Sequence, residues 1–236
     1  MEKTFILTND DGINAEGIKA LKQAIKGNKF IVAPTQQLSG CGHQFTTKKP
    51  ITVTKNNDQE YAVEGTPVDC TRIALSYLCP HGNYVVSGIN AGGNLGVDIY
   101  NSGTVAAVRE ATILGVSAIA ISHVMKSPLK IDWHFATQLT EKVLDLLLSK
   151  KLPKGCFWNV NLPPINTDFP EPKIIFCPPS IDPLPLSFKI ENNQYTYQGK
   201  YNQRISSPNT DVDVCFSGNI AISLISLNCG IDINNI

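Results

Sequence analysis

The first 34 residues constrain the fold of this chain more than any later segment. Residues 4–8 are rich in β-branched and aromatic side chains, which predicts a buried strand. Apolar residues then recur at helical spacing across residues 15–27, and a second short apolar run, residues 30–33, ends at Pro34. A strand, a helix and a second strand within about 33 residues predict a doubly wound α/β fold with a mostly parallel sheet.

Two adjacent carboxylates, Asp10 and Asp11, directly follow the first predicted strand. In an open α/β sheet, ligands bind beyond the carboxyl ends of the strands, and two neighbouring anions there are more stable beside a cation. The pair therefore predicts a divalent-metal site. The alternative is that Asn9 to Gly12 forms only a turn stabilised by an Asx hydrogen bond.

Two later polar segments supply further candidate ligands. Ser39 and His43 belong to a loop that leaves the second predicted strand, and Asn90 and Asn94 belong to a loop that leaves a strand at residues 84–87. We expect both loops at the same edge of the sheet as the Asp pair. Oxygen ligands of this kind favour Mg²⁺, Mn²⁺ or Ca²⁺ over zinc, whereas a lone His43 is more typical of a hydrogen-bonding loop residue.

The segment 88–104 is dense in glycine and leads directly into an apolar helix at residues 105–114. Free backbone N–H groups and the positive end of the helix dipole make such a helix start an anion site. Ser102, Gly103 and Thr104 would add two hydroxyls and a close backbone approach. The segment matches neither the dinucleotide fingerprint nor the Walker A loop. A cation beside such a helix start is suited to hydrolysis of phosphate esters.

The remaining predicted elements continue the α/β pattern as far as about residue 162. Thr66, followed by Pro67 and Asp69, has the pattern of a helix N-cap, and we interpret these residues as capping rather than as ligands. The predicted elements are a hairpin of residues 50–54 and 61–63, helices at 66–78 and 132–150, and strands at 117–122 and 157–161.

From residue 163 onward the composition shifts to prolines and short β-like runs, with Asn192 and Asn193 as a hairpin turn signal. We expect one domain over residues 1–236. Its α/β core covers about residues 1–162, and β-hairpin extensions over about 163–236 pair with a second subunit. The predicted runs lie at residues 174–177, 187–190, 194–201 and 220–227.

The charge balance and the cysteines exclude several classes of protein. Twenty basic and twenty acidic residues cancel, so binding of a nucleic-acid polymer is not expected. The seven cysteines are scattered without a Cys-x-x-Cys pair, which favours a reducing compartment over a disulfide framework or a zinc site. Because the N-terminus leads straight into a strand and apolar runs stay short, we expect a cytoplasmic protein without a membrane partner.

The combination of these segments resembles the SurE (survival protein E) nucleotidases. The similarity is close over about the first 125 residues and weaker at residues 159–161, 210–211 and 220–227. The segments that carry it are Ile6-Leu-Thr-Asn-Asp-Asp-Gly12, Val32-Ala-Pro34 with Ser39, Gly65-Thr-Pro-Val-Asp-Cys70, Ser87-Gly-Ile-Asn-Ala-Gly92, Asn94-Leu-Gly96 and Ser102-Gly-Thr-Val105.

This resemblance implies a Rossmann-like fold, a homodimer or homotetramer, and a metal-dependent phosphatase of nucleoside 5′- and 3′-monophosphates. Some family members also shorten polyphosphate. By matching positions, the ligands of one divalent cation per subunit (Mg²⁺, Mn²⁺ or Ca²⁺) are Asp10, Asp11, Ser39 and Asn90. The implied phosphate contacts are Asn94, Ser102, Gly103 and Thr104.

Three features depart from the family pattern. Gly93 replaces a usual proline, which predicts a looser phosphate loop, and the arginine-containing pattern is absent between Cys177 and Tyr201. The sequence also ends at Ile236 without room for the usual C-terminal helix. These departures concern the substrate side and the assembly of subunits rather than the metal site.

The predicted reaction is in-line hydrolysis of a phosphate monoester. Asp10 either activates a water or itself attacks phosphorus to give an aspartyl-phosphate, and Asp11 binds the metal. The residues leave two alternatives open. One is a regulatory module that binds a nucleotide or phosphate without catalysis, and the other is a metal-dependent hydrolase of a different ester.

Overall fold

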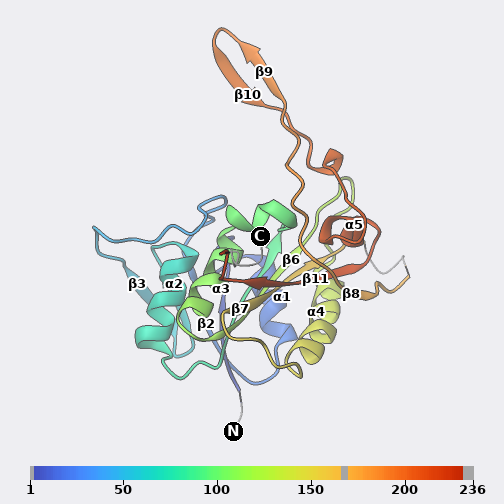
Figure 1. The fold of residues 1–236 in the computed structure, drawn as a ribbon. Coiled ribbons are helices and arrows are strands. Elements are labelled where there is room, and N and C mark those ends of the chain that lie inside the picture. Colours follow the sequence, from blue (N-terminus) through green and yellow to red (C-terminus); the bar gives the residue numbers. More distant parts are fainter. Residues whose placement is uncertain (1–2, 166–169, 231–236) are drawn as a thin grey trace.

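Parallel strands occupy the centre of a nine-stranded sheet in the computed structural model, which describes residues 3–165 and 170–230 (Figure 1). The strand order is β3-β4-β2-β1-β5-β6-β7-β11-β8, and only β3 and β11 run antiparallel to their neighbours β4 and β7. The predicted mostly parallel α/β sheet is thereby confirmed. The strands are β1 (Thr4–Thr8), β2 (Asn28–Pro34), β3 (Val53–Asn57), β4 (Glu60–Val63), β5 (Tyr84–Ala91), β6 (Ser117–His123), β7 (Cys156–Leu162), β8 (Ile174–Phe176) and β11 (Ile220–Ser226).

Helices cover both faces of the sheet. Phe5 and Leu7 of β1 pack in one apolar cluster with α1 and α4, whereas Ile6 packs in the opposite cluster with α2 and α3. Alternate strand residues point to opposite faces, so a fully apolar strand buries both. No helix of the described residues is long and apolar enough to cross a membrane. The helices are α1 (Glu16–Ala24), α2 (Pro67–Ile73, continued by a π turn Ala74–Leu78), α3 (Gly103–Ile113), α4 (Trp133–Leu147) and α5 (Asp211–Phe216).

Local signals set several element boundaries. The predicted cap is confirmed, because Thr66 Oγ1 accepts a hydrogen bond from Asp69 N at 3.1 Å and the Asp69 carboxylate accepts one from Thr66 N at 3.0 Å. The strand predicted to end at Ser87 instead continues to Ala91, because Asn90 and Ala91 pair with the end of β6. The second strand also extends further than predicted: Pro34 is the last residue of β2 and pairs with Val63 of β4.

The C-terminal half divides between the central sheet and a projecting ribbon. Strands β8 and β11 extend the sheet, whereas β9 (Phe188–Glu191) and β10 (Gln194–Tyr197) form a separate hairpin that stands away from the core (Figure 1). Asn192 and Asn193 have φ values of 48° and 60°, as the predicted tight turn requires. The domain boundary near residue 162 stays a prediction, and the expected lack of a C-terminal helix concerns residues 231–236, outside the described residues.

The segment after the ribbon clamps the loop that follows β5. Arg204 Nη1 lies 2.7 Å from Asp98 Oδ2 in the 3₁₀ turn Gly96–Tyr100, and Arg204 Nη2 donates to Leu95 O at 3.1 Å. The carboxylate of Asp211 accepts a hydrogen bond from Gly96 N at 2.7 Å. Sequence analysis missed Arg204, which lies just beyond the segment in which an arginine was sought. The C-terminal residues therefore support the loop rather than forming a loose appendage.

Arg204→Ala is expected to lower the free energy of unfolding by about 3 kcal/mol, because the Asp98 carboxylate would stay largely buried without its ionic partner. Urea-induced unfolding measures this loss. Lys26→Ala is the matched control, since Lys26 and Asp145 form an exposed pair worth less than about 1 kcal/mol. Equal losses in the two variants would contradict a stabilising role for the Arg204–Asp98 pair.

Candidate functional site

The candidate site lies where the chain changes direction across the sheet. Strands β1 and β5 are neighbours, but the chain after β1 continues to β2 on one side and the chain after β5 continues to β6 on the other. Such a switch point leaves a crevice at the carboxyl ends of the two strands. Asp10 and Asp11 follow β1, and Asn90 lies near the end of β5. The two predicted metal-binding carboxylates therefore lie next to the glycine-rich segment 88–104.

Asp10 is buried against the first turn of α3. Its side chain is only 5% exposed, and Thr104 Oγ1 donates a hydrogen bond to Asp10 Oδ1 at 2.5 Å. Burial raises the pKa of Asp10 to about 6; the hydrogen bond from Thr104 opposes this shift, and the charge of Asp11 adds to it. The structure thus holds a poorly solvated carboxylate beside a second one.

Gly103 makes the contact between α3 and Asp10 possible. A Cβ atom at residue 103 would lie 2.9 Å from Asp10 Cβ and 3.0 Å from Cys41 Sγ, distances that require the neighbours to move. Ser102 caps the helix, with its Oγ accepting a hydrogen bond from Val105 N at 3.1 Å. The predicted anion site at residues 102–104 is therefore a capped helix start that touches the predicted metal ligand.

Asp11 connects the site to the other two predicted ligands. Its Oδ2 accepts a hydrogen bond from Ala91 N at 3.2 Å, which joins it to the end of β5 next to Asn90. Gln37 Nε2 lies 3.4 Å from Asp11 Oδ1 and 2.9 Å from Ser39 Oγ, so it bridges these two side chains. Sequence analysis did not single out Gln37, because glutamines are common in polar loops and no spacing marks this one.

The four predicted ligands fit a hard divalent cation. They supply two carboxylates, the Ser39 hydroxyl and the Asn90 amide, whose Nδ2 donates to Gly92 O at 2.8 Å and so leaves Oδ1 for a cation. Burial is the main cause of the raised pKa of Asp10, and the neighbouring charge of Asp11 adds to it, so a cation at this position would stabilise the ionised pair. Within the described residues, no group of three or more His, Cys, Asp or Glu side chains is placed to hold a metal, so a cation bound by Asp10 and Asp11 would need other oxygen ligands, such as those of Ser39 and Asn90.

Asn94 is held in place by asparagines of a neighbouring strand. Its backbone N–H donates to Asn161 Oδ1 at 2.8 Å, and its carbonyl accepts from Asn159 Nδ2 at the same distance. Its side-chain Nδ2 donates to Ser122 Oγ at 2.8 Å. Polar residues inside the otherwise apolar strand β7 were the available sequence signal for this support.

His43 is a structural residue of the loop that carries Ser39. Its Nε2 lies 2.9 Å from Glu110 Oε2 on α3, and Arg109 Nη1 lies 3.5 Å from its Nδ1. The interpretation of His43 as a hydrogen-bonding loop residue is therefore confirmed. Through His43 and Glu110, the loop is attached to the same helix whose first turn contacts Asp10.

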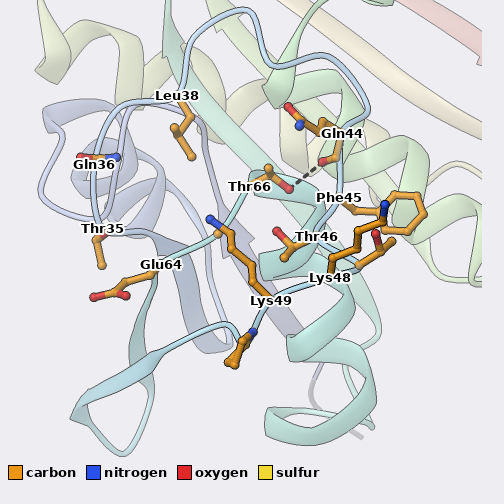
Figure 2. A pocket seen from close by; sticks show the side chains of 13 residues that line it. Thr35, Gln36, Leu38, Gln44, Phe45, Thr46, Lys48, Lys49, Glu64 and Thr66 are labelled. Atoms are coloured by element: carbon orange, nitrogen blue, oxygen red, sulfur yellow. Dashed lines mark hydrogen bonds between the residues drawn. The ribbon is translucent and has the colours of Figure 1, made fainter.

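A cavity of about 810 Å³ lies beside this loop, over the ends of β2 and β4 (Figure 2). We call it the loop cavity. Its lining includes four threonines and two lysines, and Thr66 Oγ1 donates to Gln44 O at 2.7 Å across one wall. Figure 2 shows Lys49 pointing toward Thr66 and Lys48 lying beside the ring of Phe45. Sequence analysis did not indicate this cavity.

The model of one protein family, described as Survival protein SurE, matches residues 5–178. This chain belongs to the SurE family. The resemblance found in the sequence motifs is thereby confirmed. The roles of Asp10, Asp11, Ser39, Asn90, Asn94 and residues 102–104 remain predictions, supported by the geometry described above.

Several relatives match most of this SurE chain. A protein of Nostoc sp., provisionally named a 5′-nucleotidase, is 52% identical over 221 residues, covering 93% of this chain and 98% of the relative. The 5′-nucleotidase SurE of Pelobacter propionicus is 41% identical over 176 residues, covering 72% and 70% of the two chains. The crystal structure of the SurE protein from Aquifex aeolicus aligns with a TM-score of 0.85 at 29% identity, covering 96% and 94%.

Addition of Mn²⁺ or Mg²⁺ at about 100 times its Kd is expected to stabilise this SurE protein by about 2.7 kcal/mol, because a ligand that binds only the folded state raises its stability. Asp10→Asn and Asp11→Asn should lose most of this gain. In EDTA, Asp10→Asn should be no less stable than the wild type, since it removes one of two adjacent charges. Thermal unfolding with and without metal measures both effects, and an undiminished metal response in Asp10→Asn would contradict the site.

Proposed function

We propose that this chain is a 5′-nucleotidase that hydrolyses nucleoside 5′-monophosphates to nucleoside and phosphate. Membership of the SurE family and the 5′-nucleotidase names of its relatives support this activity. One structural observation carries the proposal for this chain: the buried carboxylate of Asp10 touches the first turn of α3 through Gly103 and Thr104. The helix start that would bind an anion and the carboxylate that would bind a cation are therefore in direct contact.

The phosphate group would be held by the first turn of α3 and by Asn94. The N–H groups near Gly103 and Thr104 lie at the positive end of an eleven-residue helix, and Ser102 adds a hydroxyl. Asn94 is fixed by β6 and β7, so its side chain needs little reorganisation when phosphate binds. Any 3′-monophosphate or short polyphosphate substrate, which the family resemblance implies, would use the same contacts.

The cation would be held by Asp10, Asp11, Ser39 and Asn90. A divalent cation bound there would neutralise charge on the phosphoryl oxygens and lower the pKa of a bound water. In this mechanism Asp10 would also accept a proton from the attacking water. Because Thr104 Oγ1 donates to Oδ1 of Asp10, the other carboxylate oxygen would either hold the cation or, in the alternative mechanism, attack phosphorus directly.

The same geometry argues against a module that only binds phosphate. Two carboxylates beside an anion site weaken phosphate binding by like-charge repulsion unless a cation lies between them. A cation held between carboxylates and an anion site stabilises the charge that develops on an attacking and a leaving oxygen during phosphate-ester hydrolysis. Catalysis, rather than passive retention of a nucleotide, explains why both acids are present.

The protein is expected to release phosphate from AMP in the presence of Mn²⁺ or Mg²⁺, and EDTA should abolish the release. Asp10→Asn should lower kcat by about 10²- to 10⁴-fold, the usual contribution of a general base. Asp145→Asn is the matched control, since Asp145 is exposed on α4, and it should retain wild-type kcat. Tight AMP binding without phosphate release by the wild type would instead support the regulatory module.

We also propose that the chain forms a homodimer or homotetramer in the cytoplasm. The β9–β10 ribbon is a two-stranded hairpin apart from the core, which is marginally stable in water by itself. Its apolar residues are strongly exposed, with Ile190 60% and Tyr195 67% accessible. Burial of these side chains against a second copy would stabilise both hairpins. Cysteines without disulfide partners are typical of a reducing compartment.

Tyr195→Asp is expected to reduce the molecular mass measured by light scattering from that of an oligomer toward that of one chain, because a charge would be placed in the buried interface. Tyr77→Asp makes the same change at another exposed tyrosine, 82% accessible near the end of α2, and should leave the mass unchanged. A Tyr195→Asp protein with the wild-type mass would show that the ribbon does not hold the subunits together.

A further inference from the structure

A second cavity, of about 320 Å³, lies beyond β6 and β7, whereas the loop cavity lies beyond β2 and β4; strands β1 and β5 of the candidate site come between them in the sheet. We infer that this cavity receives the base of the nucleotide substrate; this inference rests on the proposed 5′-nucleotidase activity. The cavity lies beyond the end of β6, between Pro164 after β7 and residues 201, 202 and 216 of the C-terminal segment. We call it the base subsite.

The walls of the base subsite are suited to binding a flat aromatic ligand. Val124, Met125 and Pro164 are apolar, and the rings of Tyr201 and Phe216 lie with their centroids 6.3 Å apart. Met125 is 57% exposed and Tyr201 is 36% exposed, so apolar surface is left uncovered at the cavity. Stacking of a base on apolar and aromatic side chains stabilises such complexes.

A few polar groups complete this lining. Asn202 offers an amide with both a donor and an acceptor, and Lys126 adds a cation. A mostly apolar cavity with a small number of polar groups is the usual form of a small-molecule site, and its volume falls within the roughly 300–1,000 Å³ typical of such sites. The amide of Asn202 could pair with polar edges of a base.

The base subsite lies beside the loop that leads to the phosphate contact Asn94. Gly92 N donates a hydrogen bond to His123 O at 3.0 Å, so the loop that leads to Asn94 runs beside the end of β6. Val124, the next residue of that segment, is already a wall of the subsite. Gly93, the residue directly before Asn94, packs against this wall. A nucleotide with its phosphate at Asn94 would have its base close to this cavity.

Gly93 is the residue that joins the two regions. A Cβ atom there would lie 2.7 Å from Val124 Cγ2 and 2.9 Å from Tyr201 Oη, both atoms of subsite residues. Tyr201 is in turn fixed by its hydroxyl, which donates to Asp98 Oδ2 at 2.7 Å, and by Arg204 over its ring. The glycine that departs from the family pattern thus makes room for Tyr201, and its loop is clamped rather than loose.

The loop cavity is the less suitable place for a base. Threonine hydroxyls, two lysines and Glu64 dominate its lining, which is more polar than that of the base subsite. Polar groups of this number stay hydrated, and burying them against a base without hydrogen bonds would cost free energy. The loop cavity suits a hydrated or charged group better than a heterocycle.

The test compares AMP with ribose 5-phosphate, which has the same phosphate and sugar but lacks the base. Met125→Asp should lower kcat/KM for AMP by about tenfold, mainly through KM, because a charge would face the stacked base. The same variant should keep the wild-type kcat/KM for ribose 5-phosphate. Leu114→Asp, at the opposite end of α3 from the site, is the matched control and should change neither substrate.

Binding of adenosine provides a readout without catalysis. Calorimetric titration with adenosine should show a Kd about tenfold weaker in Met125→Asp than in the wild type. An unchanged ratio of AMP to ribose 5-phosphate activity together with unchanged adenosine binding would overturn the base subsite. A loss of AMP preference in Phe45→Ala or Lys49→Ala, but not in Met125→Asp, would also overturn it by placing the base in the loop cavity.

The two proposals fail in different ways. A wild-type protein that hydrolyses neither substrate would refute the nucleotidase activity, while adenosine binding that weakens in Met125→Asp would still support the subsite. A wild-type protein that hydrolyses both substrates with equal kcat/KM would leave the phosphatase intact and overturn the subsite.

Discussion

The contact between Asp10 and the first turn of α3 is the interaction on which the rest of the site depends. Gly103 lets the helix backbone approach the carboxylate, and Thr104 donates a short hydrogen bond to it. The carboxylate is poorly solvated, and its pKa rises to about 6 as a result. A helix start that attracts anions and an acid pair that attracts a cation therefore meet at one point, which suits a metal-bound phosphate ester.

Buried polar side chains from distant segments hold the loops around this contact. Asn161 of β7 fixes the backbone of Asn94, and Arg204 and Asp211 hold the turn that follows it. Glu110 of α3 holds the Ser39 loop through His43. Buried polar groups are stable only when hydrogen-bonded, so each of these contacts also restricts the loop to one conformation.

Elements with strong local signals were predicted well. The cap at Thr66 and the turn at Asn192 and Asn193 follow from side chains that hydrogen-bond nearby backbone or tolerate positive φ. Predictions were wrong where pairing with another strand decided a boundary, and incomplete where an element was too short to show a pattern. Strand β5 continues past Ser87 because β6 offers it partners, and the short helix α5, which is too brief for a clear periodic pattern, was missed.

The sequence by itself determined the kind of chemistry: an acid pair after a strand and a glycine-rich loop before a helix are local patterns, readable along the chain. Only the tertiary structure decided that Gln37 bridges Asp11 to Ser39, that Arg204 reaches Asp98, and that Gly93 makes room for Tyr201. The physical reason is that such contacts depend on sheet order and strand register, which arise from packing the whole chain.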